Sequence, residues 1–229
     1  MTGALPFGGA SVMQRRVEPP SSLDFFPTPP WATRALIHHV LRRKGLLLDE
    51  TVWEPAAGEG HMAEVLREFF AGVVATDVFD YGRGYRVVDF LSDATPGGTD
   101  WIITNPPFKV AAEFVLRALA EAKVGVAVLV RTSWLEGGDR YRRIFQPNPP
   151  AIIGQFCERV PMTKGRWDPE ASTATSYSWV VWTKGGTLLP SGDTVLTWIP
   201  PGQRTALTKP DDAARFGMKP KAGLLEAGA

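Results

Sequence analysis

Residues 99–114 read TDWIITNPPFKVAAEF and predict a strand, a rigid turn and the beginning of a helix. The apolar run that ends at Thr104 has the character of a buried strand. Pro106 and Pro107 end it, because neither residue offers an N–H to a β-ladder. From Ala111 the sequence AAEFVLRALAEA places apolar and charged residues on opposite faces of a helix. A strand, a turn and a helix in this order are typical of a parallel α/β sheet.

The alternation of strands and helices continues on both sides of this unit. Short apolar runs occur at 51–53, 72–76, 85–88, 100–104, 124–130, 151–157 and 177–182. Helical patterns such as HMAEVLREFF separate the earlier runs, which favours a mostly parallel sheet with helices on both faces. Residues 161–176 have no helical periodicity, so the last two runs should pair as a hairpin. The sequence therefore predicts an α/β fold with a seven-stranded sheet whose last strand is antiparallel.

One main domain with two smaller flanking parts is expected. The chain has 229 residues, of which 44% are hydrophobic, and this is sufficient for one core. Residues 1–22 are rich in Gly, Pro and Ser and should form a flexible N-terminal arm. Residues 23–184 contain all the predicted strands, and residues 185–229 should form a small C-terminal appendage.

The composition also limits the compartment and the chemistry. No apolar run approaches the roughly 18 residues that a transmembrane helix needs, and the N-terminus lacks the apolar segment of a secretory signal. Cys157 is the only cysteine, which excludes an internal disulfide and fits a reducing compartment. Three histidines without ligand spacing make a metal site unexpected. We therefore expect a cytoplasmic protein without a metal and without membrane contact.

Charge is distributed unevenly, although the formal net charge is only +1. Residues 45–100 carry eleven acidic and three basic side chains, whereas residues 131–167 carry three acidic and seven basic ones. Residues 1–44 also have a basic excess, with six basic and two acidic side chains. This pattern fits a site that holds a cationic ligand beside a polyanion, but a scatter of solvated charges would look similar.

Acidic residues follow three successive predicted strands. Glu54 precedes a tight turn of Gly58 and Gly60, where glycine lets the backbone approach a ligand closely. Asp77 ends the next strand, where an acid commonly accepts two ribose hydroxyls, and Asp89 ends the third. These acids should meet at one edge of the sheet. The turn has no GxGxxG pattern, which disfavours a nicotinamide-dependent oxidoreductase, and the preceding acid favours a ligand with a positive end.

The turn after the fourth strand offers two hydrogen-bond acceptors on a rigid frame. Asn105 has a side-chain carbonyl oxygen, and the Pro-Pro unit fixes the direction of the Pro106 carbonyl. Together they can accept both hydrogens of an exocyclic amino group and draw its nitrogen toward a tetrahedral, more nucleophilic geometry. Phe108 can stack on the ring that carries the amino group, a contact worth about 1–3 kcal/mol in nucleic-acid complexes.

These motifs resemble those of the S-adenosylmethionine-dependent amino-methyltransferases of DNA, specifically the adenine-N6 enzymes. Over residues 24–184 the chain has FFPTPPW, EPAAGEG, ATD, DF and NPPF in the order of that family. The resemblance implies a Rossmann-like class I methyltransferase fold and S-adenosyl-L-methionine as cofactor. It also implies methyl transfer to N6 of an adenine flipped out of double-stranded DNA, in a bacterial or phage-infected cytoplasm and with no obligate protein partner.

The resemblance further implies roles for individual residues. The residues that would bind the cofactor are Phe26, Thr28, Pro29, Glu54, Ala56, Gly58, Gly60, Asp77, Asp89, Phe90 and Asn105. Within this set Phe26, Thr28 and Pro29 would contact the methionine end, Asp77 the ribose, and Asp89 with Phe90 the adenine. The catalytic residues that would hold the target base are Asn105, Pro106, Pro107 and Phe108. The residues that would contact nucleic acid are Lys109, Arg140, Arg142, Arg143, Lys164, Arg166 and Trp167, with Trp167 as a base-stack or wedge.

Two departures from the family pattern leave alternatives open. The first acid of the family is commonly Asp and is Glu54 in this chain, and the tail 185–229 is short for a full recognition domain, although it could contact DNA. Related tetrapeptides occur in enzymes that methylate cytosine N4 in DNA, guanine N2 in ribosomal RNA, or a glutamine amide in protein. A catalytically silent binding module on the same fold is a further alternative.

Overall fold

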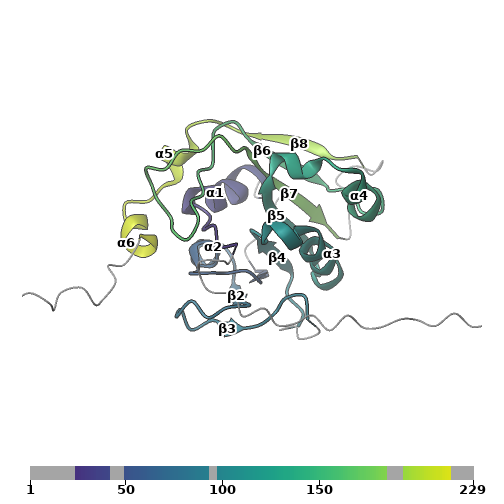
Figure 1. Ribbon diagram of the computed structural model, residues 1–229, viewed down its shortest axis with the longest axis horizontal. Helices are drawn as coiled ribbons and strands as arrows, with labels where there is room; N and C mark the ends of the chain where they lie inside the picture. The colour runs from purple at the N-terminus through teal and green to yellow at the C-terminus, as the bar shows by residue number, and fades with distance from the viewer. Residues whose placement is uncertain (1–23, 42–48, 93–96, 185–192, 218–229) are drawn as a thin grey trace, which may run out of the picture.

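The sheet of the computed structural model has eight strands in the order β3-β2-β1-β4-β5-β7-β6-β8 (Figure 1). The structure describes residues 24–41, 49–92, 97–184 and 193–217. The strands are β1 (Thr51–Glu54), β2 (Gly72–Asp77), β3 (Arg86–Val87), β4 (Trp101–Thr104), β5 (Gly125–Arg131), β6 (Ile152–Phe156), β7 (Tyr177–Thr183) and β8 (Val195–Ile199). Neighbouring strands pair in parallel, except that β7 is antiparallel to both β5 and β6.

The predicted class is confirmed, because the sheet is mostly parallel and β6 and β7 form the expected antiparallel pair. The predicted number of seven strands is wrong. Residues Val195–Ile199 add β8, which pairs in parallel with β6 at the edge of the sheet. The run VLTWI alternates half-buried and exposed side chains as an edge strand does, and only Ile199 is fully covered. The sheet therefore continues past residue 184, where we expected a boundary.

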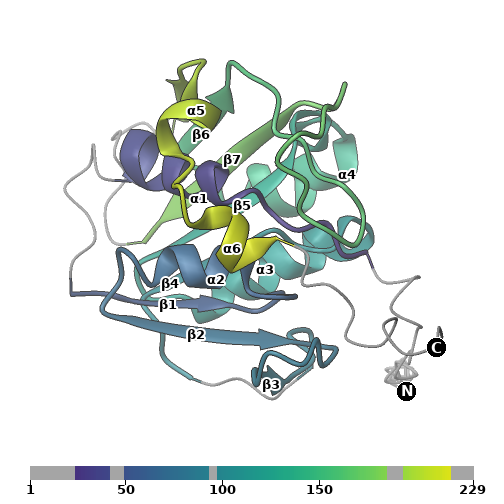
Figure 2. The ribbon, with the colours of Figure 1, turned by 90° about the vertical axis from the view of Figure 1, so that its left-hand side faces the viewer.

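Helices cover both faces of the sheet (Figure 1). One face carries α1 (Pro30–Ala35), its π-helical continuation η1 (Leu36–Leu41), α2 (His61–Leu66), α5 (Gln203–Leu207) and α6 (Asp212–Phe216). Figure 2 looks onto this face. The other face carries α3 (Ala111–Glu121), α4 (Gly138–Arg140) and η5 (Tyr141–Phe145). Short 3-10 turns, η3 (Phe108–Val110) and η4 (Thr132–Leu135), follow β4 and β5.

Each face has its own apolar cluster. Alternate residues of a strand point to opposite faces, so Ile103 packs with Trp31 on the α1 side while Ile102 packs with Phe114 on the α3 side. All four side chains are at least nine-tenths buried. The Trp179 indole N–H donates to the carbonyl oxygen of Ala32 at 3.1 Å, which joins α1 to β7. The helices of both faces thus pack directly on the strands of the sheet.

The residues after β8 are joined to the same body by Arg34, whose side chain is 2% exposed. Its guanidinium donates to the Asp212 carboxylate on α6 at 2.6 and 2.7 Å, and to Glu68 after α2 at 2.9 and 3.0 Å. These two carboxylates raise the pKa of Arg34, while its burial acts in the opposite direction. Residues 193–217 therefore share buried contacts with the N-terminal helix.

The arm predicted for residues 1–22 lies outside the described residues. Among the described residues, none of the helices combines the length and the apolar character that a bilayer-spanning helix requires.

Candidate active site

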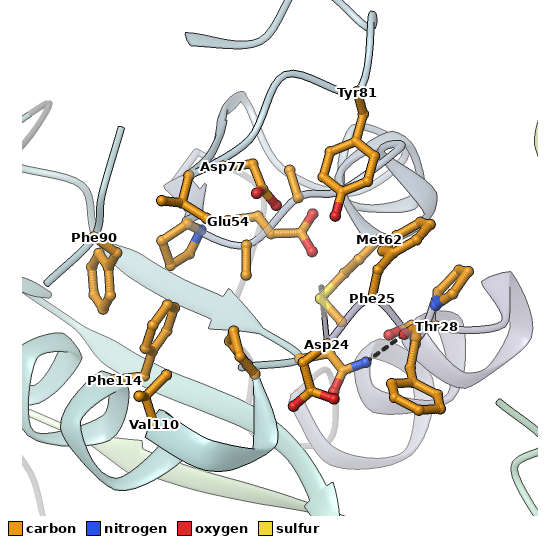
Figure 3. A pocket seen from close by; sticks show the side chains of 18 of the residues that line it. Asp24, Phe25, Thr28, Glu54, Met62, Asp77, Tyr81, Phe90, Val110 and Phe114 are labelled. Atoms are coloured by element: carbon orange, nitrogen blue, oxygen red, sulfur yellow. Dashed lines mark hydrogen bonds between the residues drawn. The ribbon is translucent and has the colours of Figure 1, made fainter. Parts of the chain in front are cut away.

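A pocket opens at the carboxyl edge of the sheet, where β1, β2 and β4 end (Figure 3). Its walls come from these strand ends, from residues 24–28 and from the beginning of α3. The lining residues are Asp24, Phe25, Phe26, Pro27, Thr28, Glu54, Pro55, Ala56, Ala57, His61, Met62, Asp77, Val78, Tyr81, Asp89, Phe90, Leu91, Asn105, Pro107, Val110 and Phe114. Most of the predicted cofactor residues therefore surround one cavity. Pro29, Gly58, Gly60, Pro106 and Phe108 lie outside this lining.

Glu54 is the most deeply buried acid of the pocket. Its side chain is 2% exposed, and its Oε2 atom has no hydrogen-bond partner among the described residues. Burial raises the pKa of this carboxyl well above its usual value, and the nearby Asp77 carboxylate adds to the shift. An unpaired buried carboxylate oxygen is costly unless a donor or a cation reaches it. The geometry fits a positively charged group of a ligand.

Asp77 organises the glycine turn. Its Oδ2 accepts the Gly58 N–H at 2.8 Å and its Oδ1 accepts the Phe79 N–H at 3.0 Å. Burial raises the pKa of Asp77, while the backbone hydrogen bonds from Gly58 and Phe79 oppose the shift. A carboxylate has about four acceptor positions, so these backbone donors leave room for a hydroxyl of a ligand.

The turn requires glycine at both predicted positions. Gly58 has φ +53° and Gly60 has φ +88°, a region that other residues rarely adopt. A Cβ atom on Gly58 would overlap the ring of Phe25, and one on Gly60 would overlap the Tyr85 hydroxyl. The two glycines therefore shape the pocket from behind rather than line it.

The opposite end of the pocket is apolar. The Phe90 ring lies between Trp53 and Phe114, with centroid distances of 4.9 and 4.8 Å. Val110 also lines this end (Figure 3). Asp89 is exposed at the rim, and its Oδ1 accepts the Leu91 N–H at 2.9 Å. The arrangement can hold a flat apolar or aromatic group with a carboxylate beside it.

Asn105 lines the pocket, and its side-chain oxygen has no hydrogen-bond partner among the described residues. Its Nδ2 donates to the carbonyl oxygen of Phe26 at 2.9 Å and lies 3.5 Å from the Met162 sulfur. Its Oδ1 is buried without a partner among the described residues. The Phe26 carbonyl can only accept a hydrogen bond, so it must face the side-chain nitrogen of Asn105 and not the oxygen. This contact therefore leaves the Asn105 oxygen available for a ligand. The free atom is an acceptor for an N–H group.

Residues 24–28 form a strap across the pocket. Asp24 Oδ2 accepts the Phe108 N–H at 2.6 Å, and the Phe25 carbonyl accepts the Gly165 N–H at 2.9 Å. The Phe25 ring also lies 4.8 Å from the Tyr81 ring. The strap thus connects the turn after β4 with the loop 161–176 and with the segment after β2.

The basic residues that were predicted to contact nucleic acid fall into three groups. Lys109, Lys164 and Arg142 are exposed, with Arg142 4.0 Å from the Asp139 carboxylate, whereas Arg140 donates to the Trp134 and Glu136 carbonyls. Arg143 is paired with Glu113 and Asp139, and the exposed Arg166 with Asp168.

Trp167 does not have the exposed position that a wedge or a base-stack requires. Its side chain is only 6% exposed, because it packs with Val65 and Phe216 in a small apolar cluster. The sequence could not distinguish an exposed tryptophan that contacts bases from a buried one, since an aromatic residue in a polar loop fits either position.

Several residues that line the pocket were not predicted as site residues from the sequence. Asp24 and Phe25 directly precede Phe26 and the PTPPW segment, and this position is the sequence feature that could have indicated them. Tyr81 follows Asp77 by four residues without a recognisable pattern. Phe114 was assigned to the apolar face of a helix, and one side of that face lines the pocket. Among the described residues there is no group of three or more His, Cys, Asp or Glu that could hold a metal ion.

No protein-family model matches the chain, and no curated protein sequence matches it. Among solved structures, it is similar to a Listeria monocytogenes protein described as a class I S-adenosylmethionine-dependent methyltransferase. That likeness has a TM-score of 0.56 and 12% identity, and it covers 86% of this chain and 70% of the other. A Pyrococcus horikoshii protein described as an RNA methyltransferase has a TM-score of 0.54 and 14% identity, with 73% and 90% of the chains covered.

A third likeness is to the modification subunit of a type I restriction enzyme from Vibrio vulnificus YJ016. Its TM-score is 0.51 with 15% identity, and it covers 71% of this chain but only 45% of the other. The three likenesses share the α/β architecture and little sequence. They show that this chain has the Rossmann-like fold of class I methyltransferases.

Proposed function

We propose that the protein transfers a methyl group from S-adenosyl-L-methionine to the N6 amino group of adenine in double-stranded DNA. The observation that carries this proposal is the Asn105 side chain, whose nitrogen is held by Phe26 while its oxygen is buried and unpaired. A buried acceptor without a donor costs free energy in the ligand-free protein. A planar amino group is the partner that it fits.

The residues of the pocket fit the proposed cofactor. The unpaired Oε2 of Glu54 is suited to the positive methionine end, and the Asp77 carboxylate is suited to hydroxyls of the ribose. The slot of Phe90, Phe114 and Val110 is suited to the adenine ring. S-adenosyl-L-methionine supplies a methyl group on a positively charged sulfur. The protein contributes the position and the orientation of the acceptor.

The turn Asn105–Phe108 would hold the target base. Asn105 Oδ1 and the Pro106 carbonyl would accept the two hydrogens of the amino group and direct the nitrogen lone pair toward the cofactor side of the pocket. Asp24 holds this turn in place through the Phe108 N–H. No strong base is required, because the methylated nitrogen is acidic and loses its proton readily. Catalysis would rest on positioning rather than on proton transfer.

Adenine in DNA is favoured over the other targets by the sequence motifs, and a polyanion is favoured over protein by exposed cations such as Lys109, Arg142 and Lys164. The solved structures do not decide between nucleic acids, since one is described as an RNA methyltransferase and another as a restriction-enzyme subunit. Guanine N2 in RNA and cytosine N4 in DNA both present amino groups that the same acceptors could hold.

The experiment that tests this proposal separates these targets. Purified protein is incubated with isotopically labelled methyl donor and either unmethylated double-stranded DNA or unmodified RNA. The products are digested to nucleosides and identified by mass spectrometry. We expect label in N6-methyldeoxyadenosine. Label in N2-methylguanosine or N4-methyldeoxycytidine would replace adenine as the target, and absence of label in both polymers would refute the proposal.

A further inference from the structure

The Phe108 ring is covered by two neighbours at the carboxyl edge of the sheet. The Phe26 ring contacts it with a centroid distance of 5.1 Å and a tilt of 41°. The Arg131 guanidinium carbon lies over the ring, 4.4 Å from its centroid. A cation at this distance is attracted by the negative face of the ring. The ring on which a target base would stack is therefore occupied in the ligand-free protein.

The two neighbours differ in how firmly they are held. Phe26 belongs to the strap, and its carbonyl oxygen is bound to Asn105. Arg131 is exposed at the last position of β5, directly beside β4 in the sheet. It lies opposite the buried Tyr177 of β7; burial raises the pKa of Tyr177, and the nearby Arg131 opposes this shift. Since Arg131 is long, flexible and exposed, it can leave the ring more easily than Phe26 can.

The charge of Arg131 is also available. Within the described part of the chain, no carboxylate oxygen lies within the 4.0 Å of an ion pair with Arg131, whereas Arg143 is paired with two acids. Arg140 donates to two backbone carbonyls. A guanidinium without an acidic partner, next to a site for a nucleotide, is suited to bidentate contact with a phosphate.

We propose that Arg131 is a target-recognition residue: it covers Phe108 while no nucleic acid is bound and, when the base enters, turns to bind the phosphate beside that base. This inference rests on the proposed function. It couples two events, because stacking of the base on Phe108 displaces the guanidinium and the phosphate receives it. The exchange keeps the cation partnered in both states, so uncovering the ring has little net cost.

The test compares three substitutions of Arg131 in methyl-transfer kinetics on DNA at salt concentrations from about 50 to 200 mM. Arg131→Gln and Arg131→Met remove the charge, and Met keeps an apolar chain that can pack on the ring. Both should raise the KM for DNA about tenfold or more with a smaller effect on kcat. The slope of log(kcat/KM) against log[salt] should become shallower by about 0.9. Arg131→Lys should keep the slope of the wild type.

A matched control is Lys184→Gln, which removes one exposed positive charge at the opposite edge of the sheet, where the Lys184 N–H donates to the Val124 carbonyl. It should match the wild type, and all variants should bind S-adenosylmethionine as the wild type does. An Arg131→Met enzyme with normal KM and normal salt slope would overturn the inference, because the arginine would then only pack on the ring. A wild-type protein that methylates no nucleic acid would overturn the proposed function and this inference together.

Discussion

The side-chain amide of Asn105 donates a hydrogen bond to the Phe26 carbonyl oxygen, with 2.9 Å between the two atoms. The contact joins the strap before α1 to the turn after β4, two segments that are 79 residues apart in the sequence. The contact also determines which atom of Asn105 can bind a ligand. Its side-chain nitrogen is already bonded to Phe26, and its side-chain oxygen remains as a hydrogen-bond acceptor. The strap is therefore part of the proposed base-binding machinery as well as a wall of the cofactor pocket.

Substitution of Glu54 by Gln should show how the charge of this carboxylate contributes to cofactor affinity. Burial and Asp77 raise the pKa of Glu54, so a proton competes with a positively charged ligand for this carboxylate. Wild-type affinity for S-adenosylmethionine should therefore increase as pH rises through this raised pKa. Glu54→Gln should lower the affinity about tenfold at neutral pH and remove the pH dependence. Calorimetric titration between pH 5 and 8 measures both effects.

The control for Glu54→Gln is Glu121→Gln, which neutralises a partly exposed acid on α3 whose partner is Arg117. It should leave the affinity and its pH dependence unchanged. Equal affinity of wild type and Glu54→Gln at every pH measured would exclude contact between this carboxylate and the cofactor.

Substitution of Gly58 by Ala should destabilise the protein by about 1–3 kcal/mol, because the new Cβ overlaps the Phe25 ring in a backbone conformation with positive φ. Combining it with Phe25→Ala removes the overlap. In urea unfolding, the double variant should therefore be more stable than the sum of the two single effects predicts. If the losses of unfolding free energy in the two single variants add up in the double variant, the Phe25 ring does not restrict position 58.

His61 should make stability depend on pH. It is buried, its Nε2–H donates to the Phe216 carbonyl at 3.1 Å, and burial lowers its pKa to about 4. The unfolded chain takes up a proton near pH 6.5 and the folded protein does not, so stability is lost as pH falls from about 6.5 to about 4. The loss should be on the order of 2 kcal/mol by pH 4.5 and absent in His61→Gln. Glu68, with a pKa lowered to about 2, loses its stabilising effect only below pH 4.5.

A readout for His61 is urea unfolding of both proteins at pH 7.0, 5.5 and 4.5. A wild type and a His61→Gln variant with parallel pH profiles would show that the imidazole titrates normally in the folded state.

Asp212→Ala should destabilise the protein by about 3 kcal/mol, because it leaves the buried Arg34 with only part of its charge compensated. The neighbouring Asp211 is exposed, and its contact with Arg215 is 3.7 Å long. Asp211→Ala should therefore change stability by less than about 0.5 kcal/mol. Similar midpoints for the two variants in thermal unfolding would contradict the view that residues 193–217 belong to the core fold.

The sequence was sufficient for the parts of the fold that depend on local patterns. Apolar runs located the strands β1 to β7, and the unpatterned stretch 161–176 indicated the antiparallel pair. The edge strand β8 was missed because the half-exposed run Val195–Ile199 lacks the continuous apolar character of buried strands.

The same distinction applies to the site. Glu54, Asp77 and Asn105 could be placed at one edge because strand ends in a parallel sheet coincide. Contacts such as Gly58 against Phe25, or Arg131 over Phe108, join segments far apart in the chain and leave no periodic signal. The buried position of Trp167 depends likewise on Val65 and Phe216, which only the folded chain brings to it.

The most direct test of the account is the effect of Asn105→Ala on methyl transfer to DNA and on cofactor affinity, measured on the same preparation. The acceptor oxygen is removed while Glu54, Asp77 and the apolar slot remain. We predict at least a 10²-fold loss of turnover, by analogy with the removal of one positioned hydrogen-bond partner, and an affinity for S-adenosylmethionine within about threefold of the wild type. An Asn105→Ala protein that produces N6-methyladenine at the wild-type rate would contradict the central claim.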